Sequence, residues 1–80
     1  MGVKVLFLGP LRDVYGAEEV VLSAPLTWTS LLDHVPPGMK DTLTGSRIHV
    51  AHQGTVLADK TALDAQDGSE VALLPPVSGG

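Results

Sequence analysis

The alternation of apolar and polar positions along the chain predicts five strands. Residues 3–8 and 69–74 carry apolar side chains on both faces of the predicted strand. Shorter alternating runs at residues 19–23, 47–52 and 55–58 predict three more strands. Strands that are apolar on both faces are typical of the interior of a sheet. We therefore place residues 3–8 and 69–74 side by side at the centre of the sheet.

One amphipathic helix is predicted in the middle of the chain. The side-chain oxygen of Thr27 can cap its first turn, and Pro36-Pro37 ends it because proline disfavours helical geometry in the residue before it. Shorter helical segments are predicted at residues 11–15, closed by Gly16, and at residues 37–44. The apolar stripe of the main helix has the spacing i, i+3, i+4, i+7 and consists of Trp28, Leu31, Leu32 and Val35.

Length and composition limit the chain to one small α+β domain. The chain has 80 residues, of which 44% are apolar, so it can form a single core and is too apolar to be disordered. A helix packed on one face of a mixed sheet of about five strands accounts for the order of the predicted elements. We expect this domain to span residues 1–75 and residues 76–80 to form a projecting C-terminal tail.

The balance of residue types excludes several functional classes. The chain has no cysteine, which removes disulfides, thiolate metal sites and a cysteine nucleophile, and favours the cytoplasm. The net charge is −4 and the five basic residues are dispersed, so we expect no nucleic-acid partner. No apolar run approaches about 20 residues and the opening residues lack a signal-peptide pattern. We therefore expect a cytoplasmic protein without a membrane partner.

The polar residues form no recognisable enzyme site. The serines lie in no nucleophile elbow, and the glycines form no phosphate-binding loop. His49 and His52 are three residues apart, which on a strand places them on opposite faces and prevents a shared metal site. His34 falls on the polar side of the predicted helix, and the carboxylates are scattered. We expect no metal and no bound cofactor.

The C-terminal tail is the strongest candidate for chemistry. Pro75-Pro76 stiffens the exit from the last strand, and Val77 offers one apolar anchor. Gly79 and Gly80 have no side chains, so they can pass a constriction that any Cβ would block. A terminal carboxylate on such an arm can enter the active site of another protein. A frayed terminus that happens to end in glycines is the alternative interpretation.

The two ends of the chain resemble a known family. The opening residues 3–8, then Leu11-Arg12-Asp13 and Gly16, resemble its first strand and short helix, and residues 67–80 resemble its closing segment almost position for position. The family is that of the MoaD-type small subunits of molybdopterin synthase, related to ThiS, which are sulfur carriers with the ubiquitin-like β-grasp fold. The family often has Asn where this chain has His52, and aromatic residues at the two leucines before Pro75, both near the partner interface.

This resemblance implies a mechanism centred on Gly80. An E1-like activating enzyme would use ATP to convert the Gly80 carboxylate to an acyl-adenylate, and a persulfide sulfur donor would then produce a thiocarboxylate. The large subunit of molybdopterin synthase, in a heterotetramer of two large and two small subunits, would use this sulfur to convert cyclic pyranopterin phosphate to molybdopterin. Catalytic side chains would belong to the large subunit, so the chain is a sulfur-donating subunit. Residues that thread the tail would be Pro75, Pro76, Val77, Ser78 and Gly79.

The docking face and the pathway stay open at this point. Phe7, Leu73 and Leu74 are the candidate partner-binding residues, together with Val77 of the tail. Leu6 in place of Phe7 is one alternative, and burial of all but Val77 in the core is the other. The same Gly80 chemistry would serve a sulfur carrier for thiamine, amino-acid or tRNA thiolation. It would also serve a ubiquitin-like protein modifier, and an interaction module with an inert tail is a further alternative.

Overall fold

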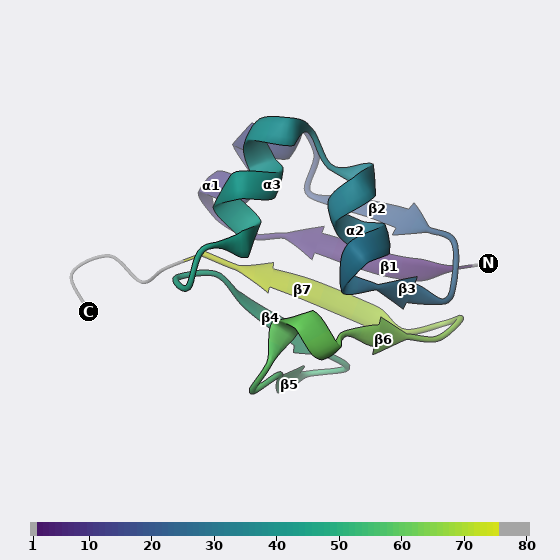
Figure 1. The fold of residues 1–80 in the computed structure, drawn as a ribbon. Coiled ribbons are helices and arrows are strands. Elements are labelled where there is room, and N and C mark those ends of the chain that lie inside the picture. Colours follow the sequence, from purple (N-terminus) through teal and green to yellow (C-terminus); the bar gives the residue numbers. More distant parts are fainter. Residues whose placement is uncertain (1, 76–80) are drawn as a thin grey trace.

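A five-stranded mixed sheet forms the centre of the protein, and three helices lie on one of its faces (Figure 1). The computed structural model describes residues 2–75. The sheet has the order β2-β1-β7-β4-β5, and a separate two-stranded sheet joins β3 to β6. The strands are β1 Val3–Phe7, β2 Glu19–Leu22, β3 Leu26–Thr27, β4 His49–His52, β5 Thr55–Val56, β6 Asp64–Ala65 and β7 Glu70–Leu74. The helices are α1 Pro10–Tyr15, α2 Trp28–His34, α3 Pro37–Thr44 and the 3₁₀ helix η1 Lys60–Ala62.

The first and last strands lie side by side at the centre, as their two-faced apolar sequences predicted. β1 and β7 are parallel, with Val5 opposite Val71 and Phe7 opposite Leu73. The outer pairs, β1 with β2, β7 with β4 and β4 with β5, are antiparallel. This mixed sheet with helices on one face confirms the predicted α+β class and the β-grasp architecture.

Local signals set the helix ends. The Thr27 side chain accepts a hydrogen bond of 3.2 Å from the Ser30 amide, so it caps α2 as expected. Gly16 ends α1 in the left-handed conformation, with φ of 97°, which glycine adopts without steric cost. α3 covers the predicted residues 37–44, and its Met39 and Leu43 are fully buried. The helix-ending signals were therefore sufficient to predict these elements.

The sequence did not reveal β3, β6 or η1. Each of the two strands contains only two residues, too few for alternation to be recognised. They pair antiparallel, with Leu26 opposite Ala65. All five predicted strands are also shorter than expected, β1, β2 and β7 by one residue each and β4 and β5 by two.

The core lies between the helices and the inner face of the sheet. On β1, the inward side chains Val3, Val5 and Phe7 are at most 1% exposed. The Phe7 ring stacks on Tyr15 with a centroid distance of 4.0 Å, which joins β1 to the end of α1. Among the residues described, no polar or charged side chain is buried. The apolar inner face therefore accounts for the folding of the domain.

Lys60 connects η1 to the segment between α3 and β4. Its Nζ donates hydrogen bonds to the carbonyl oxygens of Gly45 and, at 2.9 Å, of Ile48. The same Nζ lies 5.6 Å from the centroid of the Trp28 ring, within the range of a cation–π interaction. Burial lowers the pKa of Lys60.

We predict that Lys60→Met destabilises the protein by roughly 1–2 kcal/mol, because two backbone carbonyls lose their donor. Urea unfolding followed by circular dichroism measures the change. Lys40→Met is the matched control, since Lys40 is exposed and its side chain forms no hydrogen bond or ion pair with residues 2–75. Equal stability of the two variants would contradict a structural role for Lys60.

Candidate functional site

The sheet face opposite the helices carries a row of apolar side chains. Leu6 lies opposite Ala72, Ala72 opposite Ala51 and Ala51 opposite Val56, so the row crosses four strands. Side chains alternate between the two faces of a strand, which directs these residues away from the buried Val5 and Phe7. Figure 1 shows α1, α2 and α3 on the other side of the sheet. No helix or strand within residues 2–75 covers this row.

Further apolar side chains extend this surface, which we call the outer face. Val21 and Val56 are 60% and 54% exposed, and Leu8 is 39% exposed. Leu74, at the end of β7, is half-buried. Lys4 and Glu19 lie on the same face, opposite Val21 and Leu6, so charged side chains interrupt the apolar surface towards β2. An apolar surface that the chain does not cover is typical of an interaction site. The outer face consists of Leu6, Leu8, Val21, Ala51, Val56, Ala72 and Leu74.

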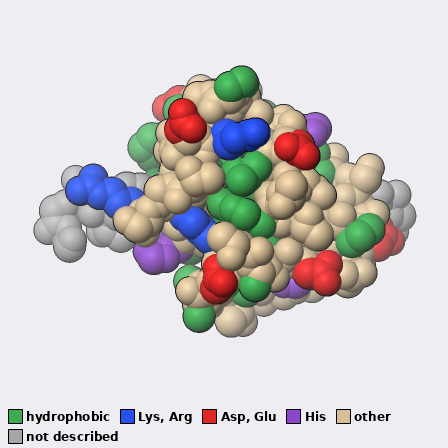
Figure 2. Space-filling view, in the orientation of Figure 1, with side chains coloured by type: hydrophobic (Ala, Val, Ile, Leu, Met, Phe, Trp, Pro, Cys, Tyr) green, Lys and Arg blue, Asp and Glu red, His purple; other side chains and the backbone are tan. Residues whose placement is uncertain are grey.

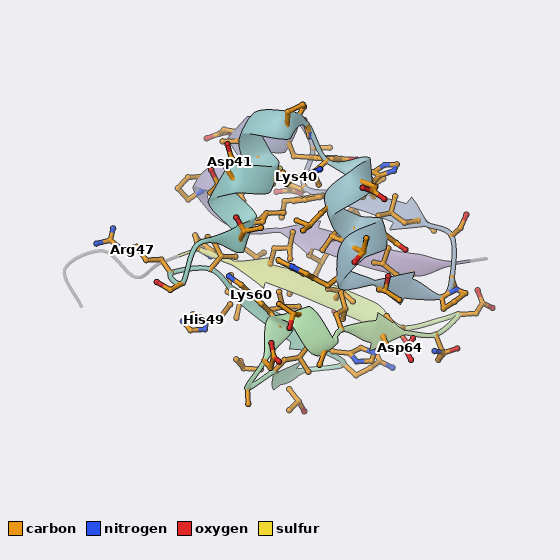
Figure 3. The ribbon with its side chains drawn as sticks, in the orientation of Figure 1. Lys40, Asp41, Arg47, His49, Lys60 and Asp64 are labelled. Carbon is orange, nitrogen blue, oxygen red and sulfur yellow. The ribbon has the colours of Figure 1, made fainter. Side chains whose placement is uncertain are left out.

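The outer face leads directly to the base of the tail. Leu74 is the last residue of β7 and lies opposite His49 of β4. The Leu8 amide donates a hydrogen bond of 3.4 Å to the Leu73 carbonyl, which holds the end of β7 against β1. Figure 3 places Arg47 and His49 at the same end of the molecule as the end of β7. An apolar surface and the point of departure of the tail are therefore adjacent.

The predicted tail residues lie almost entirely outside the described residues. The residues outside the described part of the chain are Pro76, Val77, Ser78, Gly79 and Gly80, so their roles remain predictions. Pro75 is described, and it is half-buried directly after β7.

Two of the three predicted docking residues are in the core, so that part of the prediction is wrong. Phe7 and Leu73 are 1% and 0% exposed and face each other across the parallel pair on the helix-covered side. Leu74 lies on the outer face, where it can contact a partner. Alternation alone did not say which face the helices cover. The exposed Leu8, Val21 and Val56 were missed. The apolarity of residues 3–8 on both faces signalled Leu8, whereas Val21 and Val56 lie on the edge strands β2 and β5.

The histidines do not form a site together. His49 is exposed and lies opposite Leu74 on the outer face. His52 lies opposite the buried Val71 and is therefore on the inner face. The Nε2 atom of His52 is buried and has no hydrogen-bond partner among the described residues. Within residues 2–75, no three His, Asp or Glu side chains are arranged to hold a metal ion. His34 is exposed at the end of α2.

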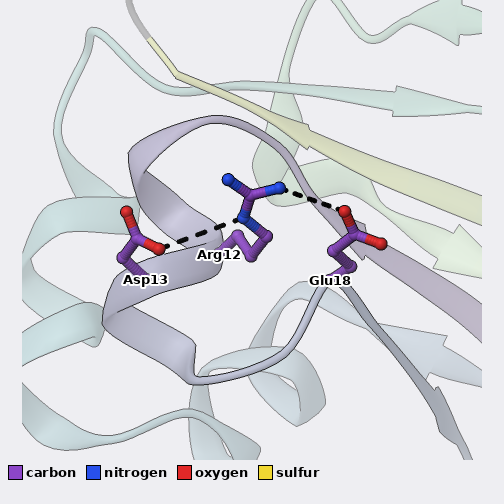
Figure 4. Close-up of polar contacts among 3 residues, drawn as sticks. All are labelled: Arg12, Asp13 and Glu18. Carbon is purple, nitrogen blue, oxygen red and sulfur yellow. Dashed lines mark hydrogen bonds and ion pairs between the residues drawn. The ribbon is translucent and has the colours of Figure 1, made fainter.

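The charged side chains form exposed local pairs. Arg12 lies 3.0 Å from Glu18 and 3.9 Å from Asp13 (Figure 4), and Lys4 lies 3.8 Å from Glu19 on the sheet. Such pairs contribute at most about 1 kcal/mol each. On the face shown in Figure 2, the lysine and arginine side chains of the described residues stand apart from one another.

Hydrogen bonds from the Thr61 hydroxyl and amide lower the pKa of Asp59, which caps η1. No helix between residues 2 and 75 is long and apolar enough to cross a membrane.

The β-grasp fold of this domain is shared with ubiquitin-like proteins of the ThiS/MoaD type. The sequence profile of the ThiS family matches residues 5–80, and the chain belongs to this family. A comparison with curated protein sequences found no match.

Solved structures with this fold include two kinds of protein. Subunit 1 in the complex of subunits 1 and 2 of the molybdopterin-converting factor from Helicobacter pylori resembles the chain, with 27% identity over all of both chains and a TM-score of 0.68. Small archaeal modifier protein 1 from Methanosarcina acetivorans is 26% identical, with a TM-score of 0.76 over 98% of this chain and 95% of that one. The same modifier from Haloferax volcanii is 26% identical over 98% of both chains, with a TM-score of 0.73.

The two faces of β7 predict opposite effects of one substitution at neighbouring positions. Leu73→Asp places a charge in the core and is expected to unfold the domain, whereas Leu74→Asp faces outward and should leave it folded. Thermal unfolding followed by circular dichroism measures both. Equal loss of structure in the two variants would mean that the outer face is not open to solvent.

Proposed function

We propose that the chain is a sulfur carrier whose Gly80 carboxylate becomes a thiocarboxylate, and that it serves as the small subunit of molybdopterin synthase. The main support is that the family match extends through residue 80. β7 lies at the centre of the sheet, so the residues before the tail are held on both sides. The similarity to one subunit of a two-subunit molybdopterin-converting factor supports a large-subunit partner.

The chemistry needs a free carboxylate and little else from this chain. A Gly80 carboxylate oxygen attacks the α-phosphorus of ATP on an E1-like enzyme, and pyrophosphate leaves. A persulfide sulfur then attacks the carbonyl carbon and AMP leaves, which forms an acyl disulfide. A second thiol of the donor system cleaves the sulfur–sulfur bond, so the thiocarboxylate remains on Gly80. In the synthase, the sulfur passes to the pterin precursor and the carboxylate is regenerated.

The outer face is the proposed docking surface for the large subunit. Leu74 and Leu8 lie beside the base of the tail, so a partner that covers them also receives the tail. Burial of apolar side chains at the centre of an interface commonly provides most of the binding free energy. ATP is a substrate of the activating enzyme in this proposal, and no cofactor is bound by the chain itself.

Intact-mass spectrometry tests the proposal. The chain is incubated with an E1-like enzyme, ATP and a persulfide donor, after its starting mass has confirmed that Gly80 is the terminal residue. The expected result is a mass gain equal to the exchange of one oxygen for sulfur, mapped to Gly80. An unchanged mass with an enzyme that loads a known carrier would contradict the proposal.

A single methyl group at the terminus should be enough to reduce loading. Gly80→Ala adds a Cβ beside the reacting carbonyl, and a displacement of about 1 Å can slow a reaction roughly 100-fold. We expect loading to fall by about 10- to 100-fold. The melting temperature should stay unchanged, because the core of the described residues is complete between Val3 and Leu73. Deletion of Gly79-Gly80 is the reference variant for complete loss of sulfur loading. Normal loading of Gly80→Ala would exclude a sterically narrow tail path.

Docking can be tested separately from the tail chemistry. Leu74→Asp should weaken binding to a large subunit of the synthase at least about tenfold, because it places a charge in an apolar interface. Val14→Asp is the control, since Val14 is 55% exposed but lies on α1, away from the outer face. Isothermal titration calorimetry measures both affinities. Equal affinities of the Leu74→Asp and Val14→Asp variants would mean that the large subunit does not dock on the outer face.

A protein modifier is the second candidate, and the similarity to two small archaeal modifier proteins favours it. The activated Gly80 would then form isopeptide bonds with lysines. Conjugates on cell proteins that disappear with Gly79-Gly80 deletion would support this function. Sulfur carriers for thiamine, amino-acid or tRNA thiolation share the Gly80 chemistry and differ only in the final acceptor.

A further inference from the structure

The base of the tail is packed against a glycine in the loop between β1 and α1. A Cβ added to Gly9 would lie 3.1 Å from the Cγ of Pro75, closer than ordinary van der Waals contact. Gly9 also has φ of +56°, in the region that side chains disfavour. Glycine at this position therefore leaves the space that the Pro75 ring occupies.

Hydrogen bonds hold the Gly9 backbone in place from both sides. The Leu8 amide donates to the Leu73 carbonyl at 3.4 Å, and the Leu8 carbonyl accepts from the Leu11 amide at 3.2 Å. The Gly9 carbonyl accepts from the Arg12 amide at 3.1 Å, in the first turn of α1. Because this loop is attached to both the sheet and α1, an added side chain at Gly9 would displace the Pro75 ring rather than the loop.

A displaced Pro75 ring would change the direction of the tail. The proline ring closes on its own backbone nitrogen, so the part of a ring displacement that a change of pucker does not absorb passes to the backbone at Pro75. The five residues 76–80 reach at most about 17 Å when extended. A rotation of about 10° at Pro75 would then move the end of such a segment by roughly 3 Å. A displacement of this size is larger than the reacting carbonyl tolerates.

We propose that Gly9 is a positioning residue for the tail: it accommodates the Pro75 ring and so sets the angle between the outer face and residues 76–80. This inference rests on the proposed function, because the angle matters only if Gly80 reacts while the domain is docked. Gly9 acts through Pro75 and touches no reacting atom.

Comparison of two glycine variants tests the proposal. Gly9→Ala and Gly16→Ala both place a side chain at positive φ, but a Cβ at Gly16 meets no atom within 4 Å. Gly16→Ala therefore controls for a positive φ at an end of α1. Gly9 has ψ of −135° and Gly16 has ψ of 6°, so the Pro75→Ala background separates the ring contact from the remaining strain at Gly9. The measurement is the rate of pyrophosphate release with ATP and an E1-like enzyme of the ThiS/MoaD type, at several carrier concentrations. Melting temperatures are measured in parallel.

The expected result is a selective loss of turnover. Gly9→Ala should lower kcat at least tenfold and leave KM within about twofold, whereas Gly16→Ala should retain the wild-type kcat. In a Pro75→Ala background, Gly9→Ala should cause a smaller loss, because the ring that it displaces is gone. A role in folding alone would lower the melting temperature of both variants without this coupling to Pro75.

The failure of the inference is distinguishable from the failure of the proposed function. If the wild-type chain releases no pyrophosphate, the proposed function fails and the inference fails with it. If the wild-type chain reacts and Gly9→Ala has the kcat of Gly16→Ala, only the inference is overturned. Should Gly9→Ala not fold, Pro75→Gly removes the ring without changing the loop. It should then lower kcat with an unchanged KM, and an unchanged kcat would overturn the inference.

Discussion

The parallel pairing of β1 with β7 determines the topology of the whole domain. Strands from opposite ends of the chain lie in register, with Val5 beside Val71 and Phe7 beside Leu73. A parallel pair cannot be closed by a tight turn, so the chain between them must cross over one face of the sheet. The three α-helices occur in this crossover, and the face that they cover becomes the core (Figure 1).

The same arrangement leaves the outer face open. All three α-helices pack on the inner face, so Leu8, Val21 and Val56 retain contact with solvent. Apolar surface that a partner covers contributes about 25 cal/mol per Å² to binding. Because β7 both carries part of the outer face and ends directly before Pro75, the proposed docking and the proposed delivery of the tail depend on the same strand. The open face is thus a consequence of the topology and a suitable surface for a partner.

Much of the fold was predictable because its signals are local. The Thr27 cap, the left-handed Gly16 and the two-faced central strands each follow from a few neighbouring residues. The assignment of faces was not predictable, since alternation is the same whether helices cover Phe7 or Leu6. Nor could the contact of Gly9 with Pro75 be read from any pattern, because it joins residues that only the β1–β7 pairing brings together.

In the proposed function the reactive group of the chain is its own carboxylate, so the chain contributes position rather than catalytic side chains. The functional demand then falls on backbone geometry: the ladder between β1 and β7, the ring of Pro75 and the space left by Gly9. A substitution that leaves every titratable group in place can therefore impair such a protein, provided that it changes where the last strand directs the chain.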